Sequence, residues 1–455
     1  MSNTTLTTAH SNTSTNTAAP VAEQLAPAAA VMVFVVFAFA YFLSSLIRAI
    51  TATLSPTLTL EFGLQARDLG LLAGGYFLGF AAMQLPLGKW LDRYGPKKVI
   101  ISFLSVAVLG SLAFAKADTF YGLLAARMLT GAGVSACLMA PLTGYRRWFA
   151  PSTQLRANSW MLMTGSMGMV ASTLPVQWLM PMWGWRGIFM ALAVMVVMAI
   201  VAIVWLVPVW EKSTPAPQLA GREPSPPAQS SGYAAVWAHP YFRSLVPLGF
   251  FSYGGLVAVQ TLWASPWMIK VAGYSASQAA TGLFWINVAM LCTFWLWGAI
   301  NPWLGRHGIS TDRLILRGLP VSFIVIAIMI IASNSVNTTA KAQFEGINSL
   351  LQALNSQSWL MWALYCMGCT FVSLAQPAIG MAFPSELAGR ALSAFNLVIF
   401  AGVFVVQWGI GLLIDGFKAL GWAEIAAFQG AFGVFLLCGI AAYVYFAVTR
   451  PGRDR

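Results

Sequence analysis

The sequence predicts an all-α, polytopic membrane protein in which twelve transmembrane helices form two six-helix bundles with pseudo-two-fold symmetry. Three observations lead to this prediction. The 455 residues are 58% hydrophobic and only 8% charged, whereas a soluble domain carries roughly 25% charged residues. Long apolar stretches recur along most of the chain. Short sequence patterns of the first half also return in the second half.

The apolar stretches are continuous and long enough to cross a bilayer as helices. A helical span needs about 20 mostly apolar residues, and backbone polar groups inside lipid must find partners within the protein. A transmembrane β-barrel would instead show short segments of alternating polarity. The five cysteines all fall within apolar stretches, so a framework of disulfide bonds is not expected.

Twelve spans are expected, and the longest polar connection follows the sixth. The spans cover approximately residues 28–54, 68–88, 98–116, 120–145, 156–180, 186–209, 244–268, 276–300, 315–333, 357–380, 391–415 and 426–449. They divide into an N-terminal bundle (28–209) and a C-terminal bundle (244–449). Residues 210–243, which include the Pro-rich stretch REPSPPAQSSG, are expected to be a cytoplasmic linker. Residues 1–27 lack Lys and Arg, unlike a signal peptide, and are expected to be a disordered tail. Residues 450–455 form a short C-terminal tail.

The placement of Lys and Arg predicts the orientation, because cytoplasmic loops of membrane proteins are enriched in these residues. If the N-terminus is inside, seventeen basic residues are also inside: Lys89, Arg93, Lys97, Lys98, Arg146, Arg147, Arg156, Lys212, Arg222, Arg243, Arg306, Arg313, Arg317, Arg390, Arg450, Arg453 and Arg455. Six are outside: Arg67, Lys116, Arg186, Lys270, Lys341 and Lys418. Both termini are therefore expected in the cytoplasm. The formal charge of +12 reflects this topology and does not argue for nucleic acid binding.

The two halves share sequence patterns at an offset of 234 residues. RANSWMLMTGSMG opens the fifth span and RALSAFNLVIFAG the eleventh, so that Arg156 matches Arg390 and Gly168 matches Gly402. PLTG and PAIG likewise end the fourth and tenth spans. Chance similarity between Gly- and Ser-rich helices is the alternative. A repeat of six spans suggests two bundles around a site at the membrane midplane.

The most distinctive motif is GKWLDRYGPKK, between the second and third spans. It resembles the G-x-x-x-D-R-x-G-[RK]-[RK] signature of the major facilitator superfamily. The residues that carry the resemblance are Gly88, Asp92, Arg93, Gly95, Lys97 and Lys98. The resemblance implies a conformational gate, in which Asp92 locks the loop against the eleventh span in one conformation and releases it in the other. The counterpart in the second half, GAINPWLGRHG, lacks the Asp, which leaves a lock there in doubt.

A second motif, RMLTGAG in the fourth span, resembles the R-x-x-x-G-x-G motif of the same superfamily. Its arginine, Arg127, is a candidate for substrate binding or for tuning proton coupling. It could equally pack against helix ends. The resemblance covers the chain from about residue 28 and implies transport by alternating access between the two bundles.

Arg48 and Arg127 are the two basic residues that lie within spans. An arginine at the centre of a lone span costs about 2.5–3.5 kcal/mol on insertion scales, so such residues are candidates for function. Tyr41 lies two helical turns before Arg48 on the same face, and a phenol beside a guanidinium can bind an anion. The alternative is that Arg48, near the end of its span, extends to the lipid headgroups. Organic-anion branches of the superfamily look similar here. A basic residue in the seventh span, as in organophosphate exchangers, is absent.

The acidic residues favour an anion over a cation as substrate. All thirteen lie in loops or at span ends, and the three histidines lie outside the spans. A cationic drug would therefore lack a buried carboxylate partner, and the usual buried proton relay is missing. A coupling proton could travel on the substrate carboxylate, and Asp68 or Glu61 is a weaker candidate carrier. The direction of transport stays open.

Other polar side chains could line a cavity or bond neighbouring helices together, and the latter is worth about 0.6 kcal/mol per hydrogen bond. They are Gln84, Asn158, Gln177, Tyr253, Gln260, Asn287, Gln376, Asn396 and Gln407. Gln260, Asn287 and Gln376 are retained as candidate substrate-binding residues, since the first, fourth, seventh and tenth spans of this superfamily, with parts of the second, fifth, eighth and eleventh, face the centre. Cys366, Met367 and Cys369 could hold a soft metal, although such residues are also ordinary membrane packing.

Taken together, the residues and the resemblance predict a secondary active transporter of the bacterial inner membrane. The favoured substrate is a small organic anion of the carboxylate type, moved by proton symport or anion exchange, with Arg48, Tyr41, Arg127, Gln260, Asn287 and Gln376 as substrate-binding candidates. The alternatives are a proton-driven exporter of drugs or metabolites, and a sensor built on the same fold. The expected partners are the substrate, a coupling proton or counter-anion, and the lipid bilayer. No enzyme activity, cofactor, metal or nucleic acid is expected, and the protein is expected to be a monomer.

Overall fold

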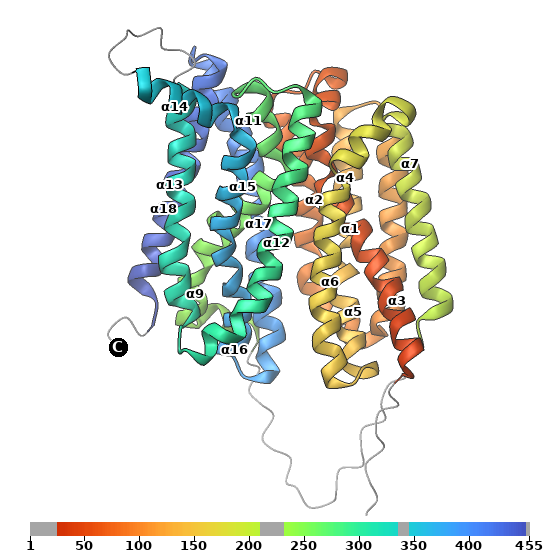
Figure 1. Cartoon of the computed structure of the whole chain (residues 1–455). Helices are drawn as coiled ribbons and strands as arrows, with labels where there is room; N and C mark the ends of the chain where they lie inside the picture. Colours follow the sequence, from red (N-terminus) through yellow and green to blue (C-terminus); the bar gives the residue numbers. More distant parts are fainter. Residues whose placement is uncertain (1–24, 210–231, 335–344, 452–455) are drawn as a thin grey trace, which may run out of the picture.

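The computed structural model describes residues 25–209, 232–334 and 345–451, and the described residues form an all-helical structure (Figure 1). In the first half the helices are α1 (Pro27–Phe62), α2 (Ala66–Ala82), α3 (Gln84–Ala115), α4 (Phe120–Val134), α5 (Ala136–Trp148), α6 (Pro151–Ala171) and α7 (Leu174–Leu206). In the second half they are α8 (Tyr233–Ala238), α9 (Pro240–Pro247), η1 (Leu248–Tyr253), α10 (Gly254–Ala258), η2 (Val259–Trp263), α11 (Ala264–Lys270), α12 (Ala276–Arg306), α13 (Thr311–Asn334), α14 (Glu345–Ser356), α15 (Ser358–Cys369), η3 (Thr370–Leu374), α16 (Ala375–Ala382), α17 (Ser385–Ala419) and α18 (Glu424–Thr449).

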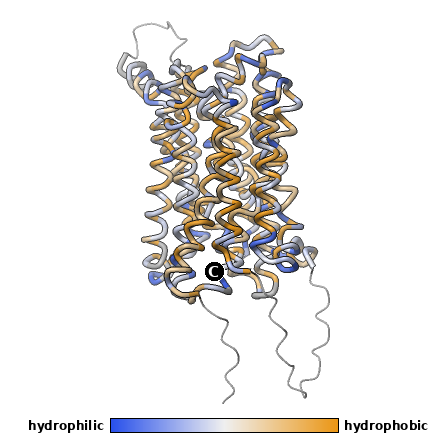
Figure 2. Tube along the Cα trace, turned by 90° about the vertical axis from the view of Figure 1, so that its right-hand side faces the viewer, coloured by the Kyte–Doolittle hydropathy of each residue, from blue (hydrophilic) through white to orange (hydrophobic). Residues whose placement is uncertain are grey.

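The long helices run side by side, and their connections gather at two ends of the molecule (Figure 1). We call the end that holds the start of α1 and the end of α18 the proximal end. The opposite end, with the connections at residues 63–65, 116–119, 271–275 and 420–423, is the distal end. Hydrophobic residues predominate along the middle of the helices, and hydrophilic residues gather toward both ends (Figure 2). This distribution is that of a protein whose middle lies in the hydrocarbon of a bilayer.

Ten helical stretches are long and apolar enough to cross a membrane in the part of the chain that the structure describes. Helix α2 is short, with 17 residues, and α6 is also outside this set. Helix α2 is followed by the first part of α3, and the chain then changes direction at Gly95. Helix α6 is likewise followed by the first part of α7, and the chain changes direction at Gly184. These two glycines have φ values of +77° and +60°, which residues with a Cβ rarely adopt.

Helix α1 differs from the sequence prediction at its distal boundary. Its span was expected to end near residue 54, because Pro56 lacks an N–H and usually ends a helix. The helix instead continues to Phe62, and Ser55 Oγ donates a 2.9 Å hydrogen bond to the carbonyl of Ala52, the group that Pro56 leaves without its helical partner. Gly63 then ends the helix in the left-handed conformation, φ +61°. Arg48 therefore lies closer to the middle of α1 than to either end.

The glycines that match between the two halves have equivalent structural roles. A Cβ on Gly168 of α6 would lie 2.3 Å from the carbonyl oxygen of Phe42 on α1. A Cβ on Gly402 of α17 would lie 2.2 Å from the carbonyl oxygen of Phe250 on η1. Each glycine thus allows close contact with the first long helical stretch of its own half, Pro27–Phe62 or Pro240–Lys270. This correspondence supports the internal repeat that the sequence suggests.

At the distal end, α2 of the first half and α17 of the second half are in direct contact. A Cβ on Gly70 would lie 2.3 Å from the carbonyl oxygen of Gln407, and a Cβ on Gly411 would lie 2.4 Å from that of Ala66. The Asp415 carboxylate accepts hydrogen bonds from the first backbone N–H groups of α2, those of Ala66 (3.3 Å) and Arg67 (2.8 Å). A carboxylate at a helix N-terminus is favourable. The two halves are therefore closed against each other at this end.

The long stretch from Pro240 to Lys270 contains two wide π-helical turns, η1 and η2. Tyr253 ends the first turn and Gln260 lies within the second. Such turns are rare and occur frequently at functional sites, because they shift the side chains that follow. The stretch is therefore irregular in the region that carries Tyr253 and Gln260.

Some predicted segments lie outside the described residues. These are most of the N-terminal tail, residues 210–231 of the linker, the loop that holds Lys341, and the last residues of the C-terminal tail.

Candidate functional site

Arg48 of α1 is the centre of the candidate site. It is partly exposed although it lies near the middle of the longest helix. Its Nε is buried and has no hydrogen-bond acceptor within the described chain. An unpaired buried donor costs about 1–3 kcal/mol, and more when it is charged. Because this unpaired donor belongs to a charged group in mid-bundle, an anionic partner from outside the chain would satisfy it.

Aromatic rings from both halves surround Arg48. Its Cζ lies 5.6 Å from the ring centroid of Phe80 on α2 and 6.0 Å from that of Phe400 on α17. The hydroxyl groups of Tyr76, Tyr41 and Tyr253 are its polar neighbours. The structure thus confirms that Tyr41 and Arg48 are close together. Guanidinium–ring contacts of this kind contribute about 0.5–2 kcal/mol, but they leave the positive charge without a counter-ion.

Arg127 of α4 is fully buried beside the same site. Its Nη1 donates a 2.9 Å hydrogen bond to the carbonyl oxygen of Ile47, the residue before Arg48. Its Cζ lies 4.9 Å above the ring of Tyr76, and Tyr76 in turn donates a 3.4 Å hydrogen bond to the carbonyl of Ser44. Arg127 therefore joins α4 to the turn of α1 that carries Arg48. This placement gives Arg127 a packing role, while its Nε and Nη2 are buried without a partner within the described chain.

In the part of the chain that the structure describes, neither Arg48 nor Arg127 forms an ion pair. The ion pairs found there lie at the distal end and join Arg67 to Asp68, Arg186 to Glu61 and Asp118, and Lys270 to Glu424. Two guanidinium groups inside the bundle without a carboxylate leave an uncompensated positive charge, which is costly in a low-dielectric interior. The site is electrostatically suited to an anion and unsuited to a cation.

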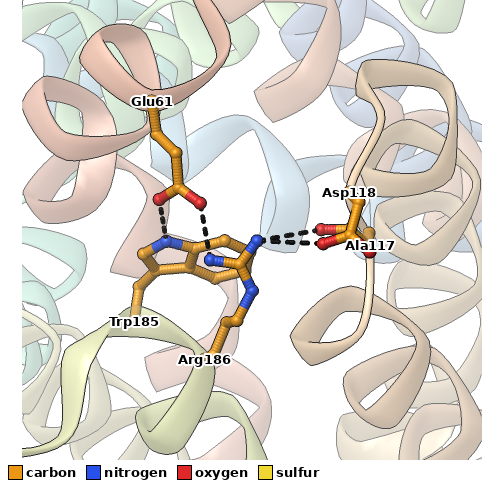
Figure 3. A network of polar contacts seen from close by, with 5 residues as sticks. All are labelled: Glu61, Ala117, Asp118, Trp185 and Arg186. Atoms are coloured by element: carbon orange, nitrogen blue, oxygen red, sulfur yellow. Dashed lines mark hydrogen bonds and ion pairs between the residues drawn. The ribbon is translucent and has the colours of Figure 1, made fainter.

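Glu61 and Arg186 belong to a polar network at the distal end of the first half (Figure 3). The Glu61 carboxylate accepts hydrogen bonds from Trp185 Nε1 (2.6 Å) and Arg186 Nη1 (2.5 Å). Arg186 Nη2 also pairs with Asp118 at 3.2 Å. The network joins the end of α1, the α3–α4 connection and α7. Since both carboxylate oxygens of Glu61 accept hydrogen bonds, the network supports a structural role for this residue.

We expect Glu61→Gln to lower the thermal stability slightly and to leave the pH dependence of transport unchanged. The pair with Arg186 is partly exposed, with side-chain exposures of 40% and 36%, and exposed pairs contribute about 0.2–1 kcal/mol. Thermal unfolding and the pH profile of uptake in proteoliposomes measure the two effects. A displaced pH optimum would instead make Glu61 a proton carrier.

The amide side chains of the second half bond mainly to one another. Gln260 Nε2 donates a 2.8 Å hydrogen bond to Asn287 Oδ1, and Asn287 Nδ2 donates one of 2.8 Å to the carbonyl of Leu283. Gln376 similarly donates to Asn396. Gln407 Nε2 donates to Thr261 Oγ1 at 3.0 Å. The contacts between side chains join adjacent helices and favour the helix-bonding alternative for Gln260, Asn287 and Gln376.

We expect Gln260→Leu and Asn287→Leu to change substrate affinity by less than about threefold, because each side chain already has a partner. Their coupling in a double-mutant cycle of unfolding should be about 0.6 kcal/mol, typical of hydrogen bonds between membrane helices. Unfolding in mixed micelles gives the coupling, and uptake kinetics give KM. A tenfold rise of KM in both single variants would return the pair to the substrate site.

The gate motif lies around the turn in α3 at the proximal end. Gly95 makes the turn, and Lys97 Nζ donates hydrogen bonds of 2.8 Å and 2.6 Å to the carbonyls of Val204 and Val207 at the end of α7. A cation is favourable at a helix C-terminus. Asp92 is exposed and forms no ion pair within the described chain. The exposed Asp92 is consistent with the released arrangement of the gate. The remaining motif residues, Gly88, Arg93 and Lys98, lie on the same helix, α3.

The Cys366–Cys369 cluster of α15 lies in the packed interior. Both thiols are buried, and the described residues contain no group of three His, Cys, Asp or Glu side chains that could hold a metal ion. The surroundings of the cluster are those of ordinary helix packing.

Sequence reasoning missed Tyr76, Phe80 and Phe400 as members of the site. Tyr76 and Phe80 are four residues apart in α2, so they share a helix face. That spacing was a signal, but it does not distinguish these rings from the many other aromatic side chains. Phe400 approaches Arg48 only through long-range packing.

Known proteins are similar to this chain in sequence and in fold. Residues 37–406 match the family described as Major Facilitator Superfamily. The chain is 26% identical to the gallate transporter of Pseudomonas putida over 56% of this chain and 62% of that protein, somewhat less than two thirds of its length. It is 24% identical to the inner membrane transport protein YajR of Escherichia coli (strain K12) over 85% of this chain and 75% of that protein.

Among solved structures, the fold is similar to that of a D-xylose–proton symporter, with a TM-score of 0.70 and 12% identity over 93% of this chain and 99% of that one. That level of identity informs on the fold alone. Three findings agree with one another. They are the family match over most of the chain, the apolar helices that run side by side (Figure 1), and the gate motif. The chain belongs to the Major Facilitator Superfamily.

Proposed function

We propose that the protein moves a small organic anion of the carboxylate type across the bacterial inner membrane by alternating access, with Arg48 as the anchor of the negative charge. The observation that carries this proposal is the position of Arg48 in mid-bundle, where its buried Nε has no acceptor and its side chain forms no ion pair within the described chain. A carboxylate matches the planar donor geometry of arginine in a bidentate pair. The relationship to a gallate transporter, whose named substrate is a carboxylate, supports the same class.

The charge distribution makes an exporter of cationic drugs the weaker candidate. A cation entering the same space would face Arg48 and, behind it, Arg127. No acidic side chain of the described chain pairs with either of them. At about 4 Å, two like charges repel by about 4 kcal/mol at the effective dielectric constant typical of protein surfaces. An anion gains a comparable amount.

The bioenergetics constrain the mode of transport. Moving one negative charge inward against a potential of 100 mV costs about 2.3 kcal/mol. Uptake therefore needs at least one accompanying proton or exchange for another anion. We favour a proton carried by the substrate carboxylate or exchange of anions, because Glu61 and Asp68 are both engaged in contacts at the distal end.

We further propose that α2 and α6, with the segments that follow them, complete twelve spans in two six-helix bundles. The equivalent glycines Gly168 and Gly402 support this arrangement. The excess of Lys and Arg at the proximal end supports a cytoplasmic location for both termini. The contact between α2 and α17 would then close the outer face.

A thermal-shift screen of the purified protein tests the proposed substrate class. Small organic carboxylates and lipophilic cations are compared at two salt concentrations. A ligand at 100 times its dissociation constant stabilises a protein by about 2.7 kcal/mol, which such a screen resolves. We expect stabilisation by carboxylates that weakens with salt, because salt screens charge pairs. Stabilisation by hydrophobic cations alone would contradict an anion site and favour the exporter.

A further inference from the structure

Phe400, on α17 of the second half, lies beside the guanidinium of Arg48, on α1 of the first half. Its ring centroid lies 6.0 Å from Arg48 Cζ and 4.4 Å from the ring centroid of Phe80. It also stacks on Phe77, with centroids 6.2 Å apart and ring planes at 15°. Phe400 is therefore in contact both with the positive charge of the site and with the aromatic face of α2.

The rings of Phe80 and Phe400 occupy the space immediately beside the guanidinium. A carboxylate held by Arg48 would pair with the guanidinium in a common plane. Because the rings of Phe80 and Phe400 are within 6.0 Å of Arg48 Cζ, they are the nearest aromatic surfaces for the group attached to that carboxylate. Aromatic rings in contact gain about 0.5–1.5 kcal/mol beyond the area that they bury. A carboxylate with a planar aromatic ring gains this contact, and a saturated carboxylate of the same size does not.

Phe400 is also partly exposed. Its position depends on the packing of α17 against α2. One turn further along α17, a Cβ on Gly74 of α2 would lie 3.0 Å from the ring of Phe404 and 3.3 Å from its carbonyl oxygen. The backbones of the two helices are therefore close to each other beside the site, and the aromatic wall around Arg48 is complete only while they remain in contact.

We propose that Phe400 is a specificity-determining residue, which selects carboxylates that carry a planar aromatic ring. This inference rests on the proposed function, in which Arg48 holds the carboxylate. Phe80 supplies the first ring of the wall from α2, and Phe400 supplies the second from α17. Since the two rings belong to different halves, the ring of the substrate is in contact with both halves of the transporter, whereas its carboxylate is held by the first half alone.

The test compares benzoate with cyclohexanecarboxylate, which has the same charge and nearly the same size but no aromatic ring. Binding of both acids to the purified full-length protein is measured by calorimetry for the wild type, Phe400→Leu and Phe400→Tyr. Phe417→Leu, on the same helix but stacked on Trp422 near the distal end, is the matched control. We expect the wild type, Phe400→Tyr and Phe417→Leu to prefer benzoate, and Phe400→Leu to lose about 3- to 10-fold of that preference.

Two outcomes overturn the inference: equal affinity of the wild type for the two acids, or an unchanged preference in Phe400→Leu. Arg48→Gln separates these outcomes from a failure of the proposed function. If Arg48→Gln no longer binds either acid while Phe400→Leu keeps the wild-type preference, the anion site stands and the role of Phe400 does not. If Arg48→Gln binds both acids as the wild type does, the proposed function itself fails, and with it this inference.

Discussion

Arg48→Gln should abolish anion transport while the protein still inserts and folds. Gln keeps a polar side chain of moderate length but removes the charge and the planar pair of donors that a carboxylate requires. Truncating one partner of a buried charge pair costs about 2–5 kcal/mol, which corresponds to a loss of roughly 30- to 4,000-fold in affinity. Uptake of labelled benzoate into proteoliposomes measures the loss, and size-exclusion chromatography of the purified variant establishes that it is folded.

Arg48→Lys distinguishes a requirement for charge from a requirement for geometry. Lys keeps the positive charge but offers no planar fork, so we expect an intermediate affinity. Lys116→Gln is the control for removing a positive charge outside the site. Lys116 directly follows α3 at the distal end. Transport at the wild-type rate by Arg48→Gln would show that this arginine is an anchor of the helix in the membrane and not of the substrate.

Gly70→Leu should stop transport by preventing closure of the distal end. A Cβ at this position would lie 2.3 Å from the carbonyl oxygen of Gln407, a contact with backbone that cannot be relieved by a rotamer change. Overpacking of this kind costs about 1–3 kcal/mol, and here the strain exists only while α2 and α17 are in contact. The substitution should therefore move the equilibrium toward a state that is open at the distal end, by roughly 5- to 150-fold.

Labelling of an introduced cysteine measures that shift. Ala73 of α2 is buried in the closed arrangement. In a variant whose five natural cysteines are replaced by serine, Ala73→Cys should react faster with an impermeant thiol reagent when Gly70→Leu is present. Gly409→Leu is the control, because a Cβ at Gly409 of α17 would meet nothing within 4 Å. Equal labelling rates with and without Gly70→Leu would contradict a closing contact between these helices.

Hydropathy alone predicted much of the fold, because a long, continuous apolar stretch is stable in lipid as a helix. The turns were harder to predict. Gly95 and Gly184 reverse the chain within a single residue each, where the composition suggested longer connections. The distal boundary of α1 was misjudged because Pro56 is read as a helix end, whereas the hydroxyl of Ser55 compensates for the missing hydrogen bond.

The site could be predicted only in its charged part. Arg48 was identifiable because a charge inside an apolar stretch is rare and costly. Phe80 and Phe400 were not, because they are two of 29 phenylalanines and their position over Arg48 depends on packing between residues that lie far apart in the chain. Gln260 and Asn287 were expected to face a substrate. Their mutual hydrogen bond depends on the register of two neighbouring helices, which no local pattern encodes.

In the proposed transporter, Arg48 holds the negative charge of the substrate. The dissociation constant of benzoate for the purified wild type and for Arg48→Gln, determined by calorimetry at low and high salt, tests this role. We predict binding by the wild type that weakens as salt is raised, and no measurable binding by Arg48→Gln at either salt concentration. Benzoate binding of equal strength by the two proteins would contradict this role.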